Sequence, residues 1–264
     1  MTDTEILLAA YDDQMRGAPP IPPTGVTYEQ DGPLLRIVGG FRGLVSGPRS
    51  LGVRDAELDR LITRQCDYFA ARGEAVEWKT RSHDDPADLT DRLREAGFVP
   101  EDEETVLIGS AAGMAVRQPD LPEGVTLRRV TADADMRRIA AMESAVWGED
   151  WSWLADDLIG RVAAAPEEIS VHVAEADGEV VSAAWLVFRA GTEFASLWGG
   201  STLAGWRGRG IYRALVATRA ALAVARGVTY LHVDASDDSA PILRRLGFEA
   251  VTTTTPYVWS PPVG

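Results

Sequence analysis

The chain has 264 residues, of which 45% are hydrophobic, so it can bury a large core and is long enough for one large domain or two ordinary ones. Its formal net charge of -14 argues against a nucleic-acid-binding protein and favours cationic over anionic ligands, although an acidic surface also serves solubility. The single cysteine, Cys66, excludes an intrachain disulfide, and no membrane span or signal peptide is recognisable, so we expect a cytoplasmic protein without nucleic-acid or membrane partners.

Helices and strands alternate through the first half of the chain. Apolar periodicity and capping residues predict helices at residues 5–16, from Leu58 to a stop at Gly73, and between Pro86 and Gly97. Runs of strand-forming residues bounded by turn signals predict strands at residues 26–29, 33–38, 40–45, 75–80 and 105–108. A linker is expected at about residues 111–123.

The second half shows a similar order of elements. Strands are predicted at residues 125–130, 170–174, 180–188, 193–203, 229–233 and 251–259. Helices are predicted at residues 132–146, within 147–162, and at 210–226 and 240–246.

Two short sequence patterns support an internal repeat. Ala71-Arg72-Gly73 recurs as Ala225-Arg226-Gly227, and the pattern from Leu93 to Phe98 recurs from Leu243 to Phe248. We therefore predict two tandem copies, at residues 1–117 and 118–264.

A basic, glycine-rich turn lies between a predicted strand and a predicted helix of the second copy. Its sequence from Trp206 reads WRGRGIYRAL. At the N-terminus of a helix, backbone N–H groups lack intrahelical partners and attract anions, and glycines allow close approach. An ordinary turn with solvated arginines has the same residue types. The residues expected to bind a phosphate group are Arg207, Gly208, Arg209, Gly210, Ile211 and Tyr212.

This turn resembles the pyrophosphate loop of the GCN5-related N-acetyltransferase (GNAT) family, written Arg/Gln-x-x-Gly-x-Gly/Ala. Arg207 and Gly210 fit the pattern, whereas Tyr212 stands where a small residue is usual. The resemblance covers about residues 125–259 and implies a mixed α+β sheet of the acyl-CoA N-acyltransferase fold, here in two tandem copies. It also implies a transferase that uses acetyl-CoA as acyl donor and needs no metal.

In the first copy the glycine-rich turn aligns with residues 53–56 at an offset of 154 (225 − 71), where glycines are missing and Asp55 appears. We expect that copy to be truncated and degenerate, unable to bind a pyrophosphate.

The resemblance also suggests where the remaining groups act. The pantetheine arm is expected to pair with the strand end at Ser201, Thr202 and Leu203, beside a bulge suggested by Gly199-Gly200. The family's frequent general-acid tyrosine is replaced by Leu243, and no base is identified by spacing. The catalytic candidates are Ser236, Ser239, Asp234 and Glu143, and the candidates for contact with the acceptor are Trp147, Glu149, Asp150 and Trp198.

The expected function is acetyl transfer to a primary amine, with a small molecule as acceptor, by direct attack on the thioester. Two alternatives stay open. Leu243 and the missing base are compatible with a non-catalytic acyl-CoA-binding scaffold or sensor, and a protein N-terminus or lysine is another acceptor class. A homodimer is compatible with the sequence, which does not fix the oligomeric state.

Overall fold

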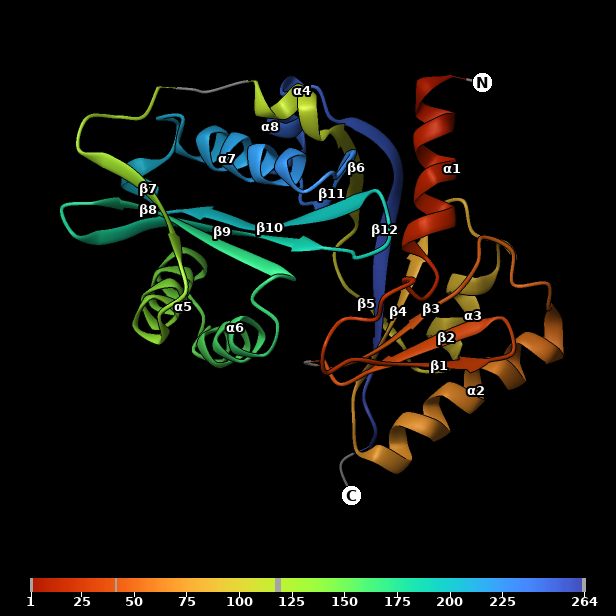
Figure 1. Ribbon diagram of the computed structural model, residues 1–264. Coiled ribbons are helices and arrows are strands. Elements are labelled where there is room, and N and C mark those ends of the chain that lie inside the picture. The colour runs from red at the N-terminus through yellow and green to blue at the C-terminus, as the bar shows by residue number, and fades with distance from the viewer. Residues whose placement is uncertain (1, 41, 117–119, 263–264) are drawn as a thin grey trace. The chain divides into compact units, whose positions relative to one another are not determined.

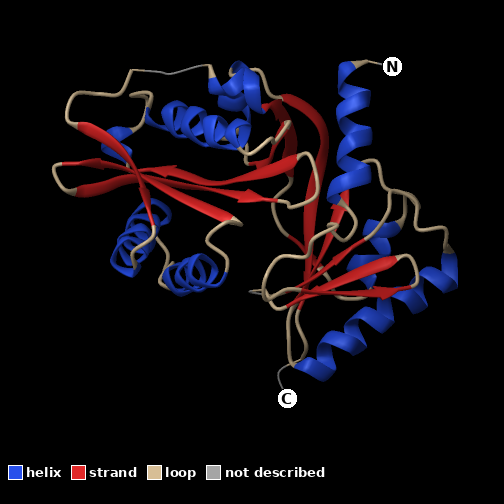
Figure 2. Cartoon of the chain, viewed as in Figure 1, coloured by secondary structure: helices blue, strands red, loops and turns tan. Residues whose placement is uncertain are grey.

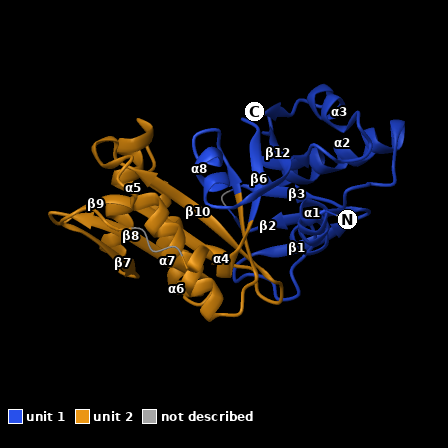
Figure 3. Cartoon of the chain, turned by 90° about the horizontal axis from the view of Figure 1, so that it is seen from above, with its two compact units in different colours: residues 1–108, 234–264 blue, residues 109–233 orange. Residues whose placement is uncertain are grey.

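The computed structural model describes residues 2–40, 42–116 and 120–262, and its chain forms two compact units. Unit 1 combines Met1–Ile108 with Asp234–Gly264, and unit 2 is the continuous segment Gly109–Val233 (Figure 3). In the described residues, no helix is both long and apolar enough to cross a bilayer. The same residues contain no group of three or more His, Cys, Asp or Glu side chains arranged to hold a metal ion.

Unit 2 is built on a five-stranded sheet with helices on both faces. Its strands run in the order β11-β10-β9-β8-β7, with a parallel β10–β11 pair and antiparallel pairing elsewhere. They are β7 (Val125–Val130), β8 (Ile169–Ala176), β9 (Glu179–Phe188), β10 (Phe194–Thr202) and β11 (Tyr230–Ala235). Helices α5 (Asp133–Trp147) and α6 (Trp153–Ala164) cover one face, and α7 (Ile211–Ala225) covers the other (Figures 1 and 2).

This two-sided cover explains the composition of the central strands. Strand β9 is buried along most of its length, without the alternation of a half-exposed strand. Trp185 packs with the α5 and α6 side chains, whereas its neighbour Ala184 packs with Ile211 and Leu215 of α7. Because successive strand residues point to opposite faces, each face of β9 needs its own apolar set.

Unit 1 has a sheet in the order β1-β2-β3-β4-β12-β6, in which only the β3–β4 pair is parallel. Its strands are β1 (Thr27–Asp31), β2 (Leu34–Val38), β3 (Gly43–Ser46), β4 (Val76–Arg81), β6 (Glu104–Ser110) and β12 (Glu249–Trp259), and the short β5 (Val99–Pro100) also pairs with β12. Its helices are α1 (Asp3–Met15), α2 (Asp55–Arg72), α3 (Leu89–Glu95) and α8 (Ala240–Arg245).

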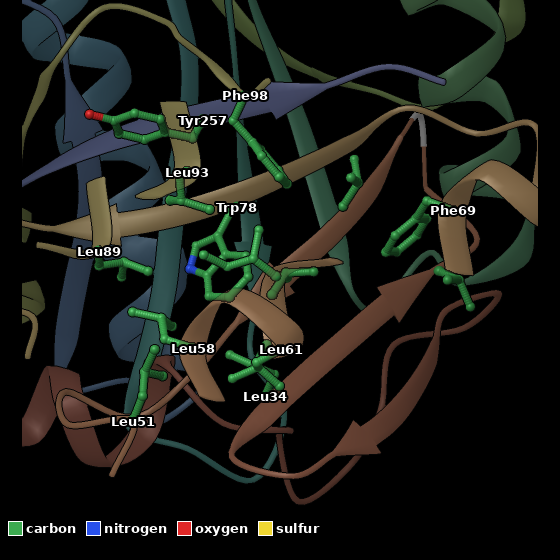
Figure 4. Close-up of a cluster of buried hydrophobic side chains, with 14 residues drawn as sticks. Leu34, Leu51, Leu58, Leu61, Phe69, Trp78, Leu89, Leu93, Phe98 and Tyr257 are labelled. Atoms are coloured by element: carbon green, nitrogen blue, oxygen red, sulfur yellow. The ribbon is translucent and has the colours of Figure 1, made fainter. Parts of the chain in front are cut away.

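The core of unit 1 forms where the apolar stripe of α2 meets the sheet. Leu58, Leu61 and Phe69 recur at helical spacing and are buried in the same apolar cluster as Trp78 of β4 (Figure 4). Gly73 ends the helix in a left-handed conformation with φ of 66°. The apolar face and the glycine stop are the two signals from which this helix was predicted.

Helix α1 begins with a capping box at Thr2 and Glu5. The Thr2 hydroxyl accepts a hydrogen bond from the Glu5 N–H, and the Glu5 carboxylate accepts one from the Thr2 N–H. Two backbone donors that have no partner within the helix are thereby satisfied. The predicted start at residue 5 is therefore late, because the helix runs from Asp3.

The order of elements confirms the duplicated pattern, because β3-α2-β4-α3 is followed later by β10-α7-β11-α8. The first copy lacks counterparts of β7, α5 and α6 and carries α1 in their stead. The linker predicted at residues 111–123 is wrong at its start, where Ala111–Ala115 form helix α4, which packs on α7. The copy boundary between residues 117 and 118 lies outside the described residues and stays a prediction.

The compact units do not coincide with the two sequence copies. Strand β12, at the end of the second copy, pairs with β4 on one side and β6 on the other, and therefore belongs to unit 1. The pairing with β4 joins segments more than 150 residues apart, as in the hydrogen bond from the Thr254 hydroxyl to the Thr80 carbonyl. The sequence pattern of a strand indicates its own periodicity, but it does not identify the strand with which it pairs.

Candidate functional site

Strand β10 carries a bulge at Gly199 and Gly200. The register against β9 shifts between Gly199 and Ser201, and both glycines have positive φ, 66° and 101°. Neither has room for a side chain. A β-carbon on Gly199 would lie 2.7 Å from the Trp185 ring, and one on Gly200 would lie 2.6 Å from the Tyr212 ring. The bulge suggested by the glycine pair is confirmed, and an aromatic ring lies against each glycine.

Replacing Gly200 with alanine tests this enclosure. The new methyl group would meet Tyr212 and would also require positive φ, so we expect a loss of about 2–4 kcal/mol in the free energy of unfolding, measured by urea titration. Gly178→Ala is the matched control, because Gly178 also has positive φ, 81°, but nothing lies within 4 Å of its β-carbon position. Equal losses in the two variants would show that Tyr212 does not constrain the bulge.

One edge of β10 is unpaired from Leu197 onward, a stretch that includes the bulge. Parallel pairing with β11 joins Phe194, Ala195 and Ser196 to their partners and then stops. Pairing with β9 continues on the other side as far as Thr202. Within the described part of the chain, no strand of unit 2 pairs with the β11-facing edge from Leu197 onward. An extended ligand can add to such an edge through backbone hydrogen bonds.

The strand leads through a 3₁₀ turn (Ala204–Trp206) into the glycine-rich turn and helix α7. Gly208 and Gly210 both have positive φ, 74° and 88°, and Gly210 is the N-cap of α7. No side chain caps this helix and its first turn contains no acid, so no side chain at its start satisfies the N-terminal N–H groups or offsets their partial positive charge. The Arg207 Nε donates to the Thr202 carbonyl at 2.9 Å, and the Arg209 guanidinium lies over the Trp206 ring, 5.0 Å from its centroid.

These features fit a pyrophosphate. Glycines in the left-handed region open the turn, since a β-carbon at Gly208 would meet no atom within 4 Å. Two exposed arginines, Arg207 and Arg209, add positive charge. Ile211 is buried against the sheet and Tyr212 packs on Gly200, so their N–H groups, not their side chains, are offered to a ligand. The turn predicted from sequence therefore has the geometry of an anion site.

Glu143 of α5 is a buried carboxylate beside the end of β10. Its side chain lies beside the Ser201 hydroxyl, which acts to lower its pKa, and its Oε2 accepts a hydrogen bond from Trp147 Nε1 at 2.9 Å. The residue is only 2% exposed, and its Oε1 has no hydrogen-bond partner in the described structure. Burial raises the pKa of Glu143, and the neighbouring Ser201 and Trp147 oppose this rise. An orphaned oxygen and a raised pKa are typical of a carboxyl group that exchanges protons.

Three tryptophans extend outward from Glu143. Trp147 and Trp151 stack with centroids 6.2 Å apart, and the centroids of Trp151 and Trp153 are 5.5 Å apart. Trp147 is 54% exposed, an unusual exposure for so large an apolar side chain. The structure thus connects Trp147 to Glu143, a link that a spacing of four residues on a helix already permits.

The other residues predicted to contact the acceptor are accessible. Glu149 and Asp150 are exposed on the loop that follows α5, and Trp198 is 52% exposed on β10. Their contact with an acceptor stays a prediction.

The other predicted catalytic residues lie in unit 1. Asp234 accepts from Lys79 Nζ at 2.5 Å, and this ion pair raises the pKa of Lys79 against the opposing effect of burial. Burial raises the pKa of nearby Glu104 to about 6, and the Asp234 charge adds to the rise. A carboxylate held by an ammonium is a weaker proton acceptor, so Asp234 suits the role of base less well than Glu143.

Ser236 is exposed and Ser239 is half-buried, and their hydroxyl oxygens are 3.3 Å apart. Ser239 is the N-cap residue of α8, but its side chain makes no capping bond and donates to the Ser236 carbonyl instead. The predicted contact of these serines with a thiol sulfur stays a prediction. Leu243, at the position of the family's tyrosine, is fully buried and supplies no polar group.

The counterpart of the glycine-rich turn in unit 1 is closed. Its helix α2 has Arg54 as N-cap, so Arg54 matches Gly210 at an offset of 156 (210 − 54), two residues from the alignment at 154 that placed Ala56 opposite Gly210. Arg54 pairs with Asp85 at 2.9 Å, and acids occupy the first turn of α2 at Asp55 and Glu57. These carboxylates offset the partial positive charge at the N-terminus of α2, where a phosphate would otherwise bind.

The strand end beside that turn is occupied as well. After three parallel pairs between β3 and β4, Ser46 donates to the Arg16 carbonyl at 3.0 Å. Arg16 Nε donates in turn to the Gly47 carbonyl at 2.8 Å, and its guanidinium pairs with Asp84 at 2.6 Å. The end of α1 therefore bonds to the place in unit 1 that corresponds to the unpaired edge of β10. Both observations support a degenerate first copy.

Sequence reasoning missed two features of the site. It assigned Ser201 only to a cofactor, because its position beside Glu143 brings together residues far apart in the chain. It also passed over Arg219, which is buried among the apolar residues of α7. A signal was present, since Arg219 lies four residues after Leu215 and is therefore on the buried face of that helix.

Comparison with known proteins relates part of this chain to a protein family. Residues 134–248 match the family model described as the acetyltransferase (GNAT) family. A solved GCN5-related N-acetyltransferase from Kribbella flavida is 19% identical with a TM-score of 0.69, over 100% of this chain and 97% of that one. A tandem GNAT protein from the clavulanic acid biosynthesis pathway is 14% identical with a TM-score of 0.64, over 99% and 95% of the two chains.

A third solved structure is the glucosamine N-acetyltransferase region of a fungal multi-domain β-N-acetylglucosaminidase, 14% identical with a TM-score of 0.59. The match covers 97% of this chain and 37% of the fungal one. At these identities the three likenesses establish the fold. No curated protein sequence matches the chain.

Proposed function

Because residues 134–248 match the acetyltransferase (GNAT) family model, we propose that the chain transfers the acetyl group of acetyl-CoA to a primary amine of a small molecule. The observation that carries this proposal is the continuity of three features in unit 2. The unpaired edge of β10, its Gly199-Gly200 bulge and the uncapped N-terminus of α7 follow one another along the chain. Together they offer backbone donors along the length of an extended, phosphate-bearing thioester.

In this proposal, residues 207–212 bind the pyrophosphate through the turn and the α7 N-terminus. Ser201, Thr202 and Leu203 then pair with the pantetheine arm as an added strand would. The Ser182 hydroxyl supports this segment by donating to the Ser201 carbonyl at 2.6 Å and lying 2.9 Å from the Thr202 hydroxyl. The thioester would then lie beside the bulge, next to Ser201.

Proton removal is the step for which Glu143 and Ser201 are suited. An alkylammonium has a pKa near 10.4 and must lose a proton before its nitrogen can attack. Ser201 is partly exposed whereas Glu143 is buried, so the substrate would meet the serine hydroxyl first. The ammonium proton passes to Ser201 Oγ as the hydroxyl proton passes to Glu143. The amine lone pair is then free, and the proton resides on a carboxyl group whose burial favours the neutral form.

An amine with an apolar or planar body suits the surface around this pair. The row of Trp147, Trp151 and Trp153 offers ring faces that attract cations and cover flat groups. Glu149 and Asp150 add negative charge on the adjoining loop. The fungal structure named for glucosamine transfer supports including amino sugars among the amines tested.

A calorimetric titration with acetyl-CoA, read for stoichiometry, tests the proposal. We expect one site per chain, followed by CoA release when arylalkylamines, diamines or amino sugars are added. Asp55→Gly should still give one site, because Arg54, Glu57 and Arg16 keep the corresponding place in unit 1 occupied. A second site in that variant would contradict the closed first copy. Binding without CoA release for any amine, peptide or protein would favour the acyl-CoA sensor, and absence of binding would overturn the proposal.

A further inference from the structure

Arg219 of α7 is a buried cation without an anionic partner. It is 1% exposed, and among the described residues no carboxylate pairs with it or acts on its pKa. Its Nε donates to the Leu215 carbonyl at 3.0 Å, and its Nη1 donates to the carbonyls of Trp185 and Trp198 at 3.1 and 3.0 Å. Buried charges are costly and normally paired. An unpaired one inside unit 2 therefore calls for an explanation.

The charge is retained at neutral pH. Burial lowers the pKa of Arg219 to about 10, still well above 7. Its field extends through the sheet, because the pKa of His172 on β8 is lowered to about 4, first by burial and then by the charges of Arg219 and Arg129. Arg219 thus places a full positive charge within the fold, against peptide groups of β9 and β10.

The two strand carbonyls bound by Arg219 flank the bulge. Trp185 and Trp198 are register partners on β9 and β10, and Gly199, where the register begins to shift, follows Trp198 directly. A bulge interrupts the ladder and leaves backbone groups to be satisfied in another way. One guanidinium nitrogen shared between the two carbonyls holds the strands together at this interruption.

This arrangement also orients the next peptide group. The Trp198 carbonyl is held on the β9 side by the nitrogen that it shares with Trp185. Carbonyl and N–H point in opposite directions across a trans peptide, so the Gly199 N–H is directed to the other edge of β10. That edge is unpaired after Ser196. A charged donor on the carbonyl also polarises the peptide and strengthens its N–H as a donor.

We propose that Arg219 is a positioning residue for acyl transfer, which directs the Gly199 N–H at the thioester oxygen and stabilises the negative charge that develops there. This inference rests on the proposed function. As the amine lone pair forms the C–N bond, the carbonyl π electrons move onto oxygen, next to the Gly199 N–H. When they return, the C–S bond breaks and its electron pair leaves with the thiolate sulfur, which takes up the surplus proton of the new amide nitrogen. The buried charge of Arg219 then has its anionic complement only while the reaction proceeds.

Arg219→Met and Arg219→Lys test the inference, with Arg161→Met on α6 as the control that removes a solvent-accessible arginine from the same unit. Loss of an oxyanion donor typically lowers kcat by about 100- to 1000-fold, and we expect Arg219→Met to fall in this range. Arg219→Lys keeps a charge, but its shorter side chain lacks the Nε bond to the Leu215 carbonyl that fixes the guanidinium, so an intermediate kcat is expected. Arg161→Met should match the wild type.

Binding of acetyl-CoA and S-ethyl-CoA, which lacks the acyl oxygen, separates this role from a purely structural one. The wild type should prefer acetyl-CoA, and both Arg219 variants should lose that preference while still binding S-ethyl-CoA within about threefold of the wild type. Equal weakening of both ligands would show that Arg219 only maintains the bulge, and would overturn the inference. If Arg219→Met does not fold, Arg219→Lys decides, since wild-type kcat and preference in that variant contradict the inference. Failure of the wild type to bind or turn over acetyl-CoA would instead refute the proposed function.

Discussion

Replacing Gly210 with glutamate is expected to raise the dissociation constant for acetyl-CoA by at least about 100-fold, or about 2.8 kcal/mol. The substitution places a carboxylate at the uncapped N-terminus of α7, where the proposed pyrophosphate would bind. It also adds a β-carbon at a residue with φ of 88°, which strains the turn. An acid at a helix N-terminus is otherwise favourable, so the fold should persist with a small change in Tm. Calorimetry and thermal unfolding measure the two effects.

Gly160→Glu is the matched control for this variant. Gly160 is exposed on α6, has no atom within 4 Å of its β-carbon position and does not have positive φ. The control therefore makes the same change in composition and net charge, and its affinity should stay within about twofold of the wild type. Tight binding of acetyl-CoA by Gly210→Glu would remove the glycine-rich turn from the proposed site.

Glu143→Gln is expected to lower kcat by about 100-fold or more, the usual contribution of a positioned base, with little change in acetyl-CoA affinity. Glutamine keeps the shape of the side chain and can still accept from Trp147, but it cannot take up a proton. Glu179→Gln, at the exposed start of β9, is the control. Steady-state CoA release measures kcat, and wild-type turnover by Glu143→Gln would exclude Glu143 as the proton acceptor.

The pH profile gives a second measurement of the same residue. Because burial raises the pKa of Glu143, the carboxylate needed for proton removal forms only at pH above the usual range of glutamate. Wild-type kcat should therefore rise with pH along an acid limb that Glu143→Gln lacks. The contribution of Glu143 to the free energy of unfolding changes with pH in the opposite direction to kcat. A raised folded-state pKa stabilises the fold below the unfolded-state value, and this contribution is lost as pH rises through the folded pKa. The glutamine variant should consequently be at least as stable as the wild type at neutral pH.

The sequence was most informative where function depends on backbone conformation. Gly208 and Gly210 lie in left-handed conformations at the helix N-terminus, as their placement predicted, and Gly199 with Gly200 forms the bulge. A positive φ at a residue favours glycine at that same residue, so these backbone conformations can be predicted without knowledge of distant contacts. The elements around these glycines followed from apolar periodicity for the same reason.

Features that depend on distant partners were not predictable in this way. The ion pair of Lys79 with Asp234 joins residues 155 positions apart, and the sequence alone made Asp234 an ordinary catalytic candidate. Ser201 and Glu143 were each singled out, but for unrelated roles, and only the structure brings them together. Arg219 lies on the apolar face of α7, and its partners are backbone carbonyls. A pattern of side chains in the sequence does not reveal such partners.

The interrupted course of unit 1 has a consequence for synthesis on the ribosome. Unit 2 is one continuous segment and has all its residues once Val233 has left the exit tunnel. The first strands of unit 1 are made earlier, but its sheet is completed later, because β12 lies between β4 and β6 and follows unit 2 in the sequence. Until then, the β4 edge is without this partner and open to wrong pairing with other nascent chains. The acyl-transfer unit is thus expected to mature before the unit whose first strands precede it in the sequence.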